Sequence, residues 1–473
     1  MATLAMPASA VDARTVTCQV LRTAQKRDES TCIDGMFSQE WLPAAASAAK
    51  EVIRMHPREG WTEDRRAGGL SRRGFLKQGA AAGAGSLLAG CSSGGTTTSG
   101  AHAAAGGIPL PRPDNPVTWP VSKDNPAIKS GLAPEQNATL RLFNWVAYIN
   151  PDCLKAFGKK YNCKVEVTTF QNMDAALAKL RSGQLHFDVF FPTVDVMAQL
   201  VYGKLIQPLN NSYIPNITQA WQDFTNPFYD GKWQYTVPYT IYTTGIAWRK
   251  DHVSENPYTM ANPWAMPWQA KYKNRVAILD DARESISLGL MKNGIFDLNT
   301  TNPSQINAAG KSLEALAQLT NVHIDNNDYT EVPSGQIWIH HAWSGDIAAA
   351  ASYMPKNVNV DVVGYWFPPD GRGPVANDTM TVLKGAPNPV LAHLFLNYML
   401  DFNNVMTNIS FNGYMQPING VTPQRLVKEQ LLPPSLMSTA VLPSYFRRGV
   451  MQLQIPVAAN ALWQQAWLKV KSA

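Results

Sequence analysis

The 473-residue sequence has little cysteine, which excludes a scaffold built on disulfide bonds. Of its five cysteines, only Cys153 and Cys163 lie in the part of the chain that we expect to fold. A helical pattern connects these two residues, and a helix of this length spans about 15 Å, which is beyond the reach of a disulfide. We therefore expect both to be small buried hydrophobic residues.

The sequence also lacks the charge excess and the short motifs of several common protein classes. Its formal net charge is +6, half of which falls within residues 1–91, and this is not the balance of a nucleic-acid-binding protein. The chain after residue 91 contains no glycine-rich phosphate-binding loop and no Gly-x-Ser-x-Gly motif. We find no internal repeat. We expect no nucleic-acid partner, no cofactor and no metal.

A long apolar run that could span a bilayer is also missing, but the front of the chain contains an export signal. Residues 71–77 read Ser-Arg-Arg-Gly-Phe-Leu-Lys, and a weakly apolar segment follows that ends in Leu-Ala-Gly-Cys at Cys91. The twin arginines resemble a Tat signal, and the ending resembles a lipobox, whose cysteine carries a lipid. We predict a Tat-type lipoprotein signal over residues 71–91 and an exported protein, periplasmic or at the cell surface, that is lipid-anchored to the membrane at Cys91. Residues 1–70 are interpreted as an extension from a mis-assigned start, with Met55 as the expected true start.

The body of the chain alternates strand and helix patterns. Residues 92–137 are rich in Ser, Gly and Pro and predict a flexible tether, so folded structure should begin near Thr139. Strand patterns then occur at residues 140–145, 165–169, 187–191, 275–279, 337–341 and 358–366. Helical patterns with Asn-Pro or Gly caps lie between them. This alternation predicts an α/β fold, mainly a parallel sheet flanked by helices.

The most informative stretch is the junction after residues 275–279. An apolar strand pattern ends in Asp280, Asp281 and Glu284, and a helical pattern follows. In open α/β sheets, ligands bind at the carboxyl ends of strands, and residues three apart at a helix start face the same side. However, Asp281 and Glu284 also have the spacing of a capping box, in which both would bond backbone N–H groups. The pattern by itself leaves both interpretations open.

Aromatic and acidic residues recur at the ends of other predicted strands. These residues are Trp145, Tyr148, Asp195, Trp343, Asp346 and Asp378. An alkylammonium ligand needs carboxylates to compensate its charges when water is removed, and it needs aromatic faces for its methylenes and for cation–π contact. The recurrence therefore favours a polyamine-like ligand.

From about Leu140 to Pro417 the sequence resembles the polyamine-binding proteins of bacterial spermidine/putrescine ABC transporters. The matching stretches are residues 144–148, 187–192, 237–239, 280–284, 343–346, Asp378 and residues 413–417. The Asp-Asp-Ala-Arg-Glu and Trp-Ser-Gly-Asp runs, in this order, are its most specific parts.

The resemblance implies a two-lobed clamshell of the periplasmic-binding-protein type, joined by crossover hinge strands. It places lobe 1 at residues 138–244 plus 379–413 and lobe 2 at residues 245–378 plus 414–473. It further implies a monomeric protein that performs no catalysis and delivers a small cationic ligand to the permease subunits of an ABC transporter.

The resemblance also assigns site residues by position. Trp145, Tyr148 and Trp343 would form aromatic walls, and Thr193 and Tyr414 would line and close the pocket. The carboxylates that pair with amino groups would be Asp281, Glu284, Asp346 and Asp378.

Three positions depart from the family pattern. Ala147 stands where members that prefer a short diamine tend to have an acidic residue, and Ala376 stands where an aromatic residue is usual. Asp195 stands where an aromatic or small residue is common, and could supply a carboxylate from another direction. These differences predict a rearranged pocket and leave open which amine binds.

Two alternatives accompany this interpretation. The same fold could bind a different small cationic solute, which the loss of the aromatic residue at Ala376 favours. A secreted hydrolase that uses Asp281 and Glu284 as an acid/base pair is the second, although two carboxylates at one helix start are poorly placed on opposite sides of a bond. A metal site at His340 and His341 is disfavoured because neighbouring residues of a strand point to opposite faces.

Overall fold

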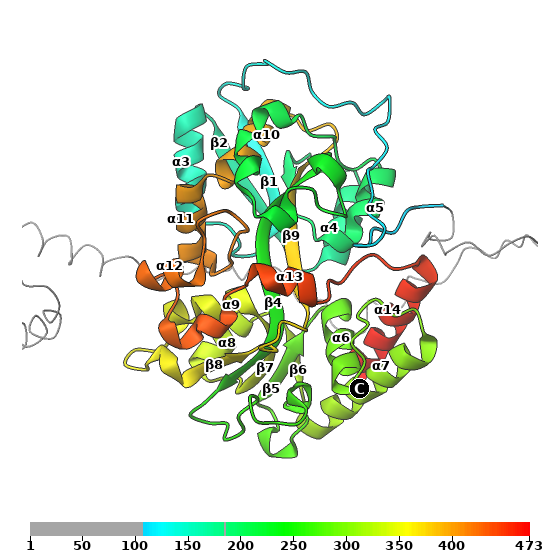
Figure 1. Ribbon diagram of the computed structural model, residues 1–473, viewed down its shortest axis with the longest axis vertical. Coiled ribbons are helices and arrows are strands. Elements are labelled where there is room, and N and C mark those ends of the chain that lie inside the picture. Colours follow the sequence, from blue (N-terminus) through cyan, green and yellow to red (C-terminus); the bar gives the residue numbers. More distant parts are fainter. Residues whose placement is uncertain (1–106, 184–185) are drawn as a thin grey trace, which may run out of the picture. The chain divides into compact units, whose positions relative to one another are not determined.

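The computed structural model describes residues 107–183 and 186–473, and the predicted α/β fold is confirmed (Figure 1). The predicted export signal, Cys91 and residues 1–70 lie outside the described residues. One sheet has the strand order β2-β1-β3-β9-β4-β7-β5-β6, and β8 pairs with β4 beside this path. Within the described residues, no helix is both long and apolar enough to cross a membrane.

The first half of the sheet is built from strands that alternate with helices. Strands β1 (Thr139–Trp145), β2 (Lys164–Phe170) and β3 (Val189–Phe190) run parallel. Helices α3 (Pro151–Tyr161), α4 (Met173–Arg181) and α5 (Met197–Tyr202) connect them or follow them. Asn150 and Asn172 cap α3 and α4 through their side chains, which is why these helices begin where the sequence predicts.

A single long strand connects the two halves of the sheet. Strand β4 (Thr236–Arg249) is buried at all 14 positions. It pairs with β9 (Val375–Val382) from Thr236 to Thr243, and from Thr244 onward with β7 (Ile339–Trp343) and β8 (Val363–Trp366). These pairings are antiparallel, whereas β5 (Val276–Leu279) is parallel to both β6 (His323–Asp325) and β7.

Helices cover both halves (Figure 1). In the first half, α10 (Pro389–Met399) and α11 (Phe402–Asn412) pack on α3. In the second, α6 (Ala282–Lys292), α7 (Pro303–Thr320) and α14 (Val457–Ser472) pack on one another. The remaining α-helices of residues 107–183 and 186–473 are α8 (Asp328–Ser334), α9 (Ser344–Ala348), α12 (Pro423–Lys428) and α13 (Pro443–Arg448).

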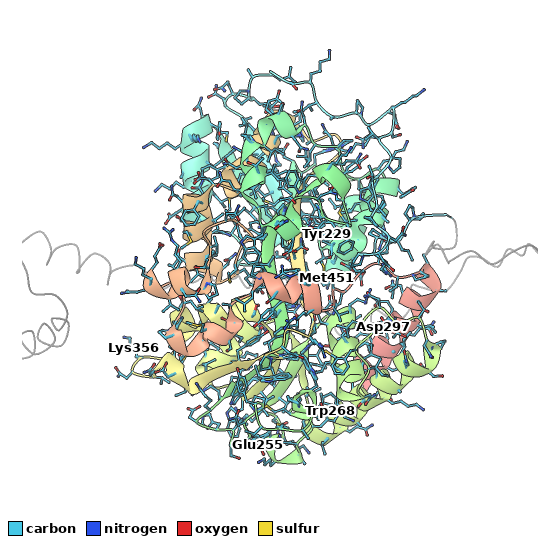
Figure 2. The ribbon with its side chains drawn as sticks, viewed as in Figure 1. Tyr229, Glu255, Trp268, Asp297, Lys356 and Met451 are labelled. Atoms are coloured by element: carbon cyan, nitrogen blue, oxygen red, sulfur yellow. The ribbon has the colours of Figure 1, made fainter. Side chains whose placement is uncertain are left out.

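Separate apolar clusters fill the interior, and one small cluster lies where the C-terminal segment crosses the fold. It comprises Val194, Tyr229 and Leu453, with Phe228 and Met451 packed against it. Figure 2 shows Tyr229 and Met451 near the middle of the view, between the two halves of the sheet. The segment before α14 is therefore packed against first-half residues.

The predicted tether needs a correction from residue 107 onward. We expected folded structure to begin near Thr139, but Trp119 is only 2% exposed and its indole Nε1 donates to the Tyr229 carbonyl (2.8 Å). Asn125 is also buried and donates to the Ile206 carbonyl (2.8 Å). The segment was predicted to be a tether from its Ser, Gly and Pro content. It also contains Val and Trp, whose apolar side chains are large enough to pack against the fold. Residues 92–106 lie outside the described part.

Candidate functional site

The Asp-Asp-Ala-Arg-Glu run lies at the junction of β5 and α6, where each of its two candidate carboxylates has its own partners. Asp281 caps α6, because its Oδ1 accepts from the N–H groups of Arg283 (2.8 Å) and Glu284 (3.0 Å). The capping interpretation is thus correct for Asp281. Glu284 instead accepts from the Trp343 indole Nε1 (3.1 Å) and the Thr244 hydroxyl (3.2 Å) through Oε1. The reciprocal half of the capping box is therefore wrong, and Glu284 connects α6 to β4 and β7.

A second group forms around Asp378 in β9. The Tyr148 hydroxyl donates to Asp378 Oδ2 (2.7 Å), and the Tyr242 hydroxyl donates to Oδ1 (3.4 Å). Tyr148 also hydrogen-bonds the Thr240 hydroxyl. Tyr148 was expected only as an aromatic wall, and its hydroxyl makes it a partner of a carboxylate as well.

Tyr414 connects this group to the Trp-Ser-Gly-Asp run. Its ring meets those of Tyr148 and Tyr242 edge-on, with centroids 4.9 and 5.8 Å apart. The ring lies directly on Gly345, where an added Cβ would be 2.2 Å from Tyr414 Cγ. Glycine is required at position 345 because any side chain would displace this ring.

The other end of that run holds a pair of acidic groups. The Asp346 carboxyl is hydrogen-bonded to that of Asp328, which is completely buried at the start of α8. Asp328 Oδ2 also accepts from the Trp343 N–H (3.0 Å). Burial, with the adjacent Asp346 charge, raises the pKa of Asp328 well above its usual value.

The remaining predicted residues come from the first half. The Thr193 hydroxyl donates to Asp195 Oδ1 (2.5 Å), and Thr193 forms a backbone bridge to Asp378. The Trp145 indole Nε1 donates to the Phe191 carbonyl (3.1 Å). Its half-buried ring packs on Phe170 at 4.6 Å between centroids.

Four carboxylates of this site share one electrostatic environment. Burial raises the pKa of Asp281 to about 6 and the pKa values of Glu284 and Asp378 to about 7 each. It also raises the pKa of Asp195, and repulsion from Asp195 adds to the shifts of Asp281 and Asp378. Desolvated carboxylates that repel one another favour a bound cation.

Arg283 is a buried cation that interacts electrostatically with these groups, and its hydrogen bonds are directed elsewhere. Its Nη1 donates to the Leu453 carbonyl (3.0 Å), and its Nη2 donates to the Leu298 carbonyl (3.0 Å) and to Asn299 Oδ1 (2.9 Å). Its guanidinium stacks over the Trp463 ring at 4.7 Å. Arg283 lowers the pKa of Asp195 through space, while the site carboxylates keep their oxygens for other partners.

Sequence reasoning missed several residues that complete the site. Tyr242 was not among the predicted site residues, yet it contacts Asp378 and Tyr414. Gln452 Nε2 donates to Glu284 Oε2 (3.3 Å) across 168 positions of sequence, and no local pattern signals this contact. Asp328, which accepts from the Trp343 N–H, was likewise not predicted.

The fold and the site together define a solute-binding protein. A family model for "bacterial extracellular solute-binding protein" matches residues 152–430, more than half of the chain, and the protein belongs to this family. Family members serve transport, and the similar solved structures are two-lobed binding proteins.

Several curated relatives and solved structures are similar to this chain. The spermidine/putrescine-binding periplasmic protein of Escherichia coli (strain K12) is 26% identical over 72% of this chain and 93% of its own. A putrescine/cadaverine-binding protein of Pseudomonas aeruginosa is 27% identical over 56% of this chain and 75% of its own. Among solved structures, a putative spermidine/putrescine ABC transporter from Listeria monocytogenes has a TM-score of 0.61 at 24% identity, over 70% of this chain and 98% of its own.

Proposed function

We propose that the protein captures a polyamine outside the cytoplasm and delivers it to the permease of an ABC importer. The observation that carries this proposal is the group of four buried or partly buried carboxylates with raised pKa values, Asp195, Asp281, Glu284 and Asp378, whose charges all act on Tyr242. The names of the curated relatives, which are putrescine and spermidine binders, support the same ligand class.

In this proposal, each ammonium group replaces the protons that the carboxylates would otherwise take up. Asp378 and Glu284 come from different elements, β9 and α6, and each would pair with one ammonium group. Trp145 and Trp343 supply faces for the methylenes, and each cation–π contact contributes about 0.5–2 kcal/mol. Binding makes and breaks no covalent bond.

The hydrolase alternative finds little support in this geometry. Asp281 Oδ1 is occupied by two backbone N–H groups, and Glu284 accepts from side chains of three other segments. Neither carboxylate is arranged as a free acid or base opposite the other.

The proposal also includes the export of the protein and its attachment to the membrane. Tat export, lipid attachment at Cys91, a monomeric state and the lobe boundaries given above accompany it as expectations. Mass spectrometry of the mature protein tests the anchor directly, since an N-terminal peptide that begins at an acylated Cys91 is expected and one that begins upstream would contradict it.

Isothermal titration calorimetry of the purified protein with putrescine, spermidine and spermine tests the ligand class. We expect 1:1 binding of at least one amine and no heat from 1,4-butanediol, which has the same length as putrescine without its charges. Asp378→Asn should weaken binding, whereas Asp361→Asn, at an exposed carboxylate outside the site, should not.

A different small cationic solute is the second candidate. Ala376 lies opposite Tyr242 in the pairing of β4 with β9, and it offers no aromatic face at this position. Binding of agmatine or another cationic amine, without binding of the three polyamines, would favour this candidate.

A further inference from the structure

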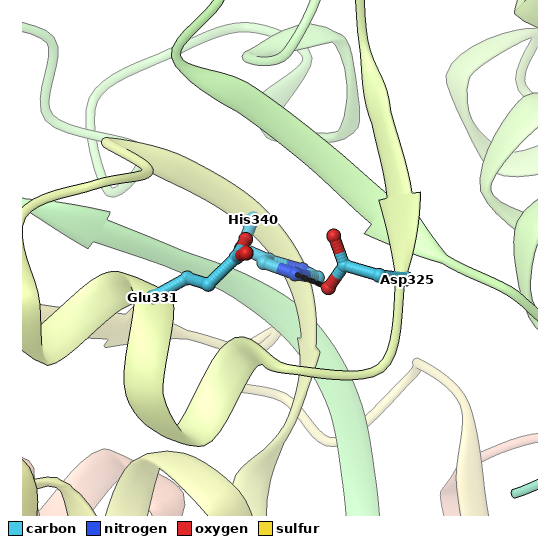
Figure 3. Close-up of side chains that lie close together, drawn as sticks. All are labelled: Asp325, Glu331 and His340. Carbon is cyan, nitrogen blue, oxygen red and sulfur yellow. Dashed lines mark ion pairs between the residues drawn. The ribbon is translucent and has the colours of Figure 1, made fainter. Parts of the chain in front are cut away.

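A group of metal-ligand type lies in the second half of the sheet, in a different position from the carboxylates around Tyr242. It consists of Asp325 at the end of β6, Glu331 in α8 and His340 in β7, which converge in Figure 3. One donor atom of each residue lies within 4.8 Å of the other two. Sequence analysis considered only His340 with His341 and missed this grouping, because its members are brought together by a strand–helix–strand connection.

The tautomer of His340 directs a lone pair toward the two carboxylates. His340 Nδ1 is 2.7 Å from the His341 carbonyl oxygen, which can only accept, so Nδ1 carries the hydrogen. In the neutral ring, Nε2 then has an unshared pair, and it faces Asp325 Oδ1 at 3.8 Å. The ring is fully buried, and Nε2 has no hydrogen-bond partner among residues 107–183 and 186–473.

The carboxylates of Asp325 and Glu331 are also oriented by hydrogen bonds to neighbouring groups. Asp325 Oδ1 accepts from the Asn327 N–H (2.8 Å), and Glu331 Oε1 accepts from Gln336 Nε2 (3.1 Å). Glu331 Oε2 is buried without a hydrogen-bond partner in the described part of the chain. Each of the three side chains is thus oriented by one hydrogen bond to a neighbouring group, the arrangement that supports metal ligands in proteins.

We propose that Asp325, Glu331 and His340 bind a divalent transition-metal ion of the Zn²⁺ type. One imidazole and two carboxylates match the nitrogen and oxygen ligands of zinc, with water completing the coordination. Mg²⁺ and Ca²⁺ prefer ligand sets made of oxygen alone, so the imidazole selects against them. The Asp325 side chain is 22% exposed and provides a route for the ion from solvent.

The position of this site has a structural consequence. Helix α8, which carries Glu331, begins at Asp328, and Asp328 accepts from the Trp343 N–H at the end of β7. A metal ion would hold α8 against β7 beside the segment that carries Trp343 and Asp346. The proposal does not depend on polyamine binding, because the metal is measured in the absence of any amine.

Calorimetry and thermal unfolding of the tag-free, EDTA-treated full chain with ZnCl₂ test the site. We expect one equivalent of Zn²⁺ to bind and to raise the unfolding temperature, and MgCl₂ at the same concentration to do neither. His340→Gln and Glu331→Gln should each weaken Zn²⁺ binding by at least about tenfold, the scale on which metal sites respond to altered ligands and their supports. The control is His252→Gln, a partly exposed histidine that stacks on Trp338, and it should leave the affinity unchanged.

Two results would overturn the proposal. One is that Zn²⁺ neither binds nor stabilises the wild-type chain, which would leave His340 and Asp325 with a structural role alone. The other is that both ligand variants retain the wild-type affinity. If His340→Gln fails to fold, Glu331→Gln, at a partly exposed position, decides the outcome.

Discussion

We expect two buried carboxyl groups, Glu284 and Asp378, to make the affinity for a cationic ligand depend steeply on pH near neutrality. Burial raises the pKa values of Glu284 and Asp378 to about 7 in the ligand-free protein. A bound ammonium favours the ionised carboxylates and therefore lowers these pKa values. Below the ligand-free pKa, protons must leave before the cation can bind, so affinity is highest at alkaline pH and is lost as the pH falls.

The magnitude follows from proton linkage. For one group with a pKa of about 7, the ionised fraction falls about tenfold between about pH 8 and about pH 6, and each tenfold loss of affinity is about 1.4 kcal/mol. Glu284 and Asp378 together give about a 100-fold loss, and about one proton is released per ligand near pH 7. The amine stays protonated throughout, because alkylammonium groups titrate near pH 10.

Calorimetry with putrescine at about pH 8 and about pH 6 measures the change in affinity. Buffers of different ionisation enthalpy measure the number of protons released. Glu284→Gln should reduce the dependence to about tenfold, because one of the two titrating groups is gone. The exposed-site variant Asp361→Asn should keep the full dependence. An affinity that changes less than about twofold between the two pH values would refute the link between these carboxylates and the ligand.

Three further substitutions test individual contacts. Asp281→Asn keeps a good helix cap but removes the charge, so putrescine binding should weaken by about 1.5–3 kcal/mol without a loss of thermal stability. Asp378→Asn should raise the unfolding temperature of the ligand-free protein at pH 8, because burial raises the Asp378 pKa and its ionised form then destabilises the fold as pH rises through about 4 to about 7. The difference in unfolding temperature between Asp378→Asn and the wild-type protein should become smaller toward pH 5. Gly345→Ala should lower stability by more than about 1 kcal/mol, since its Cβ would overlap the Tyr414 ring.

Each of these substitutions has a contrary outcome. Unchanged affinity in Asp281→Asn would leave that residue with a capping role alone. Equal stabilisation by Asp378→Asn at pH 5 and pH 8 would show that its charge is not what destabilises the fold. A wild-type unfolding temperature in Gly345→Ala would mean that Tyr414 can move away from residue 345 at little cost.

The sequence by itself determined the class of fold and the starts of several helices, but it did not reveal strands β4, β6 and β9. Strand alternation and Asn caps depend on residues a few positions apart, so the starts of α3 and α4 could be predicted from Asn150 and Asn172. The cap at Asp281 follows from the same local chemistry. The prediction of a flexible tether from composition was wrong for the Pro-rich segment, where Trp119 is buried.

Only the tertiary structure decided which side chains meet. Tyr148 donates to Asp378 across 230 positions, and Gln452 reaches Glu284 across 168. The shifted pKa values of these carboxylates also come from burial and from neighbours on other elements, which no window of sequence contains. The same holds for Asp325, Glu331 and His340, which the β6–α8–β7 connection brings together. Residue types and local periods are properties of short segments, whereas desolvation and side-chain pairing arise only when distant segments pack.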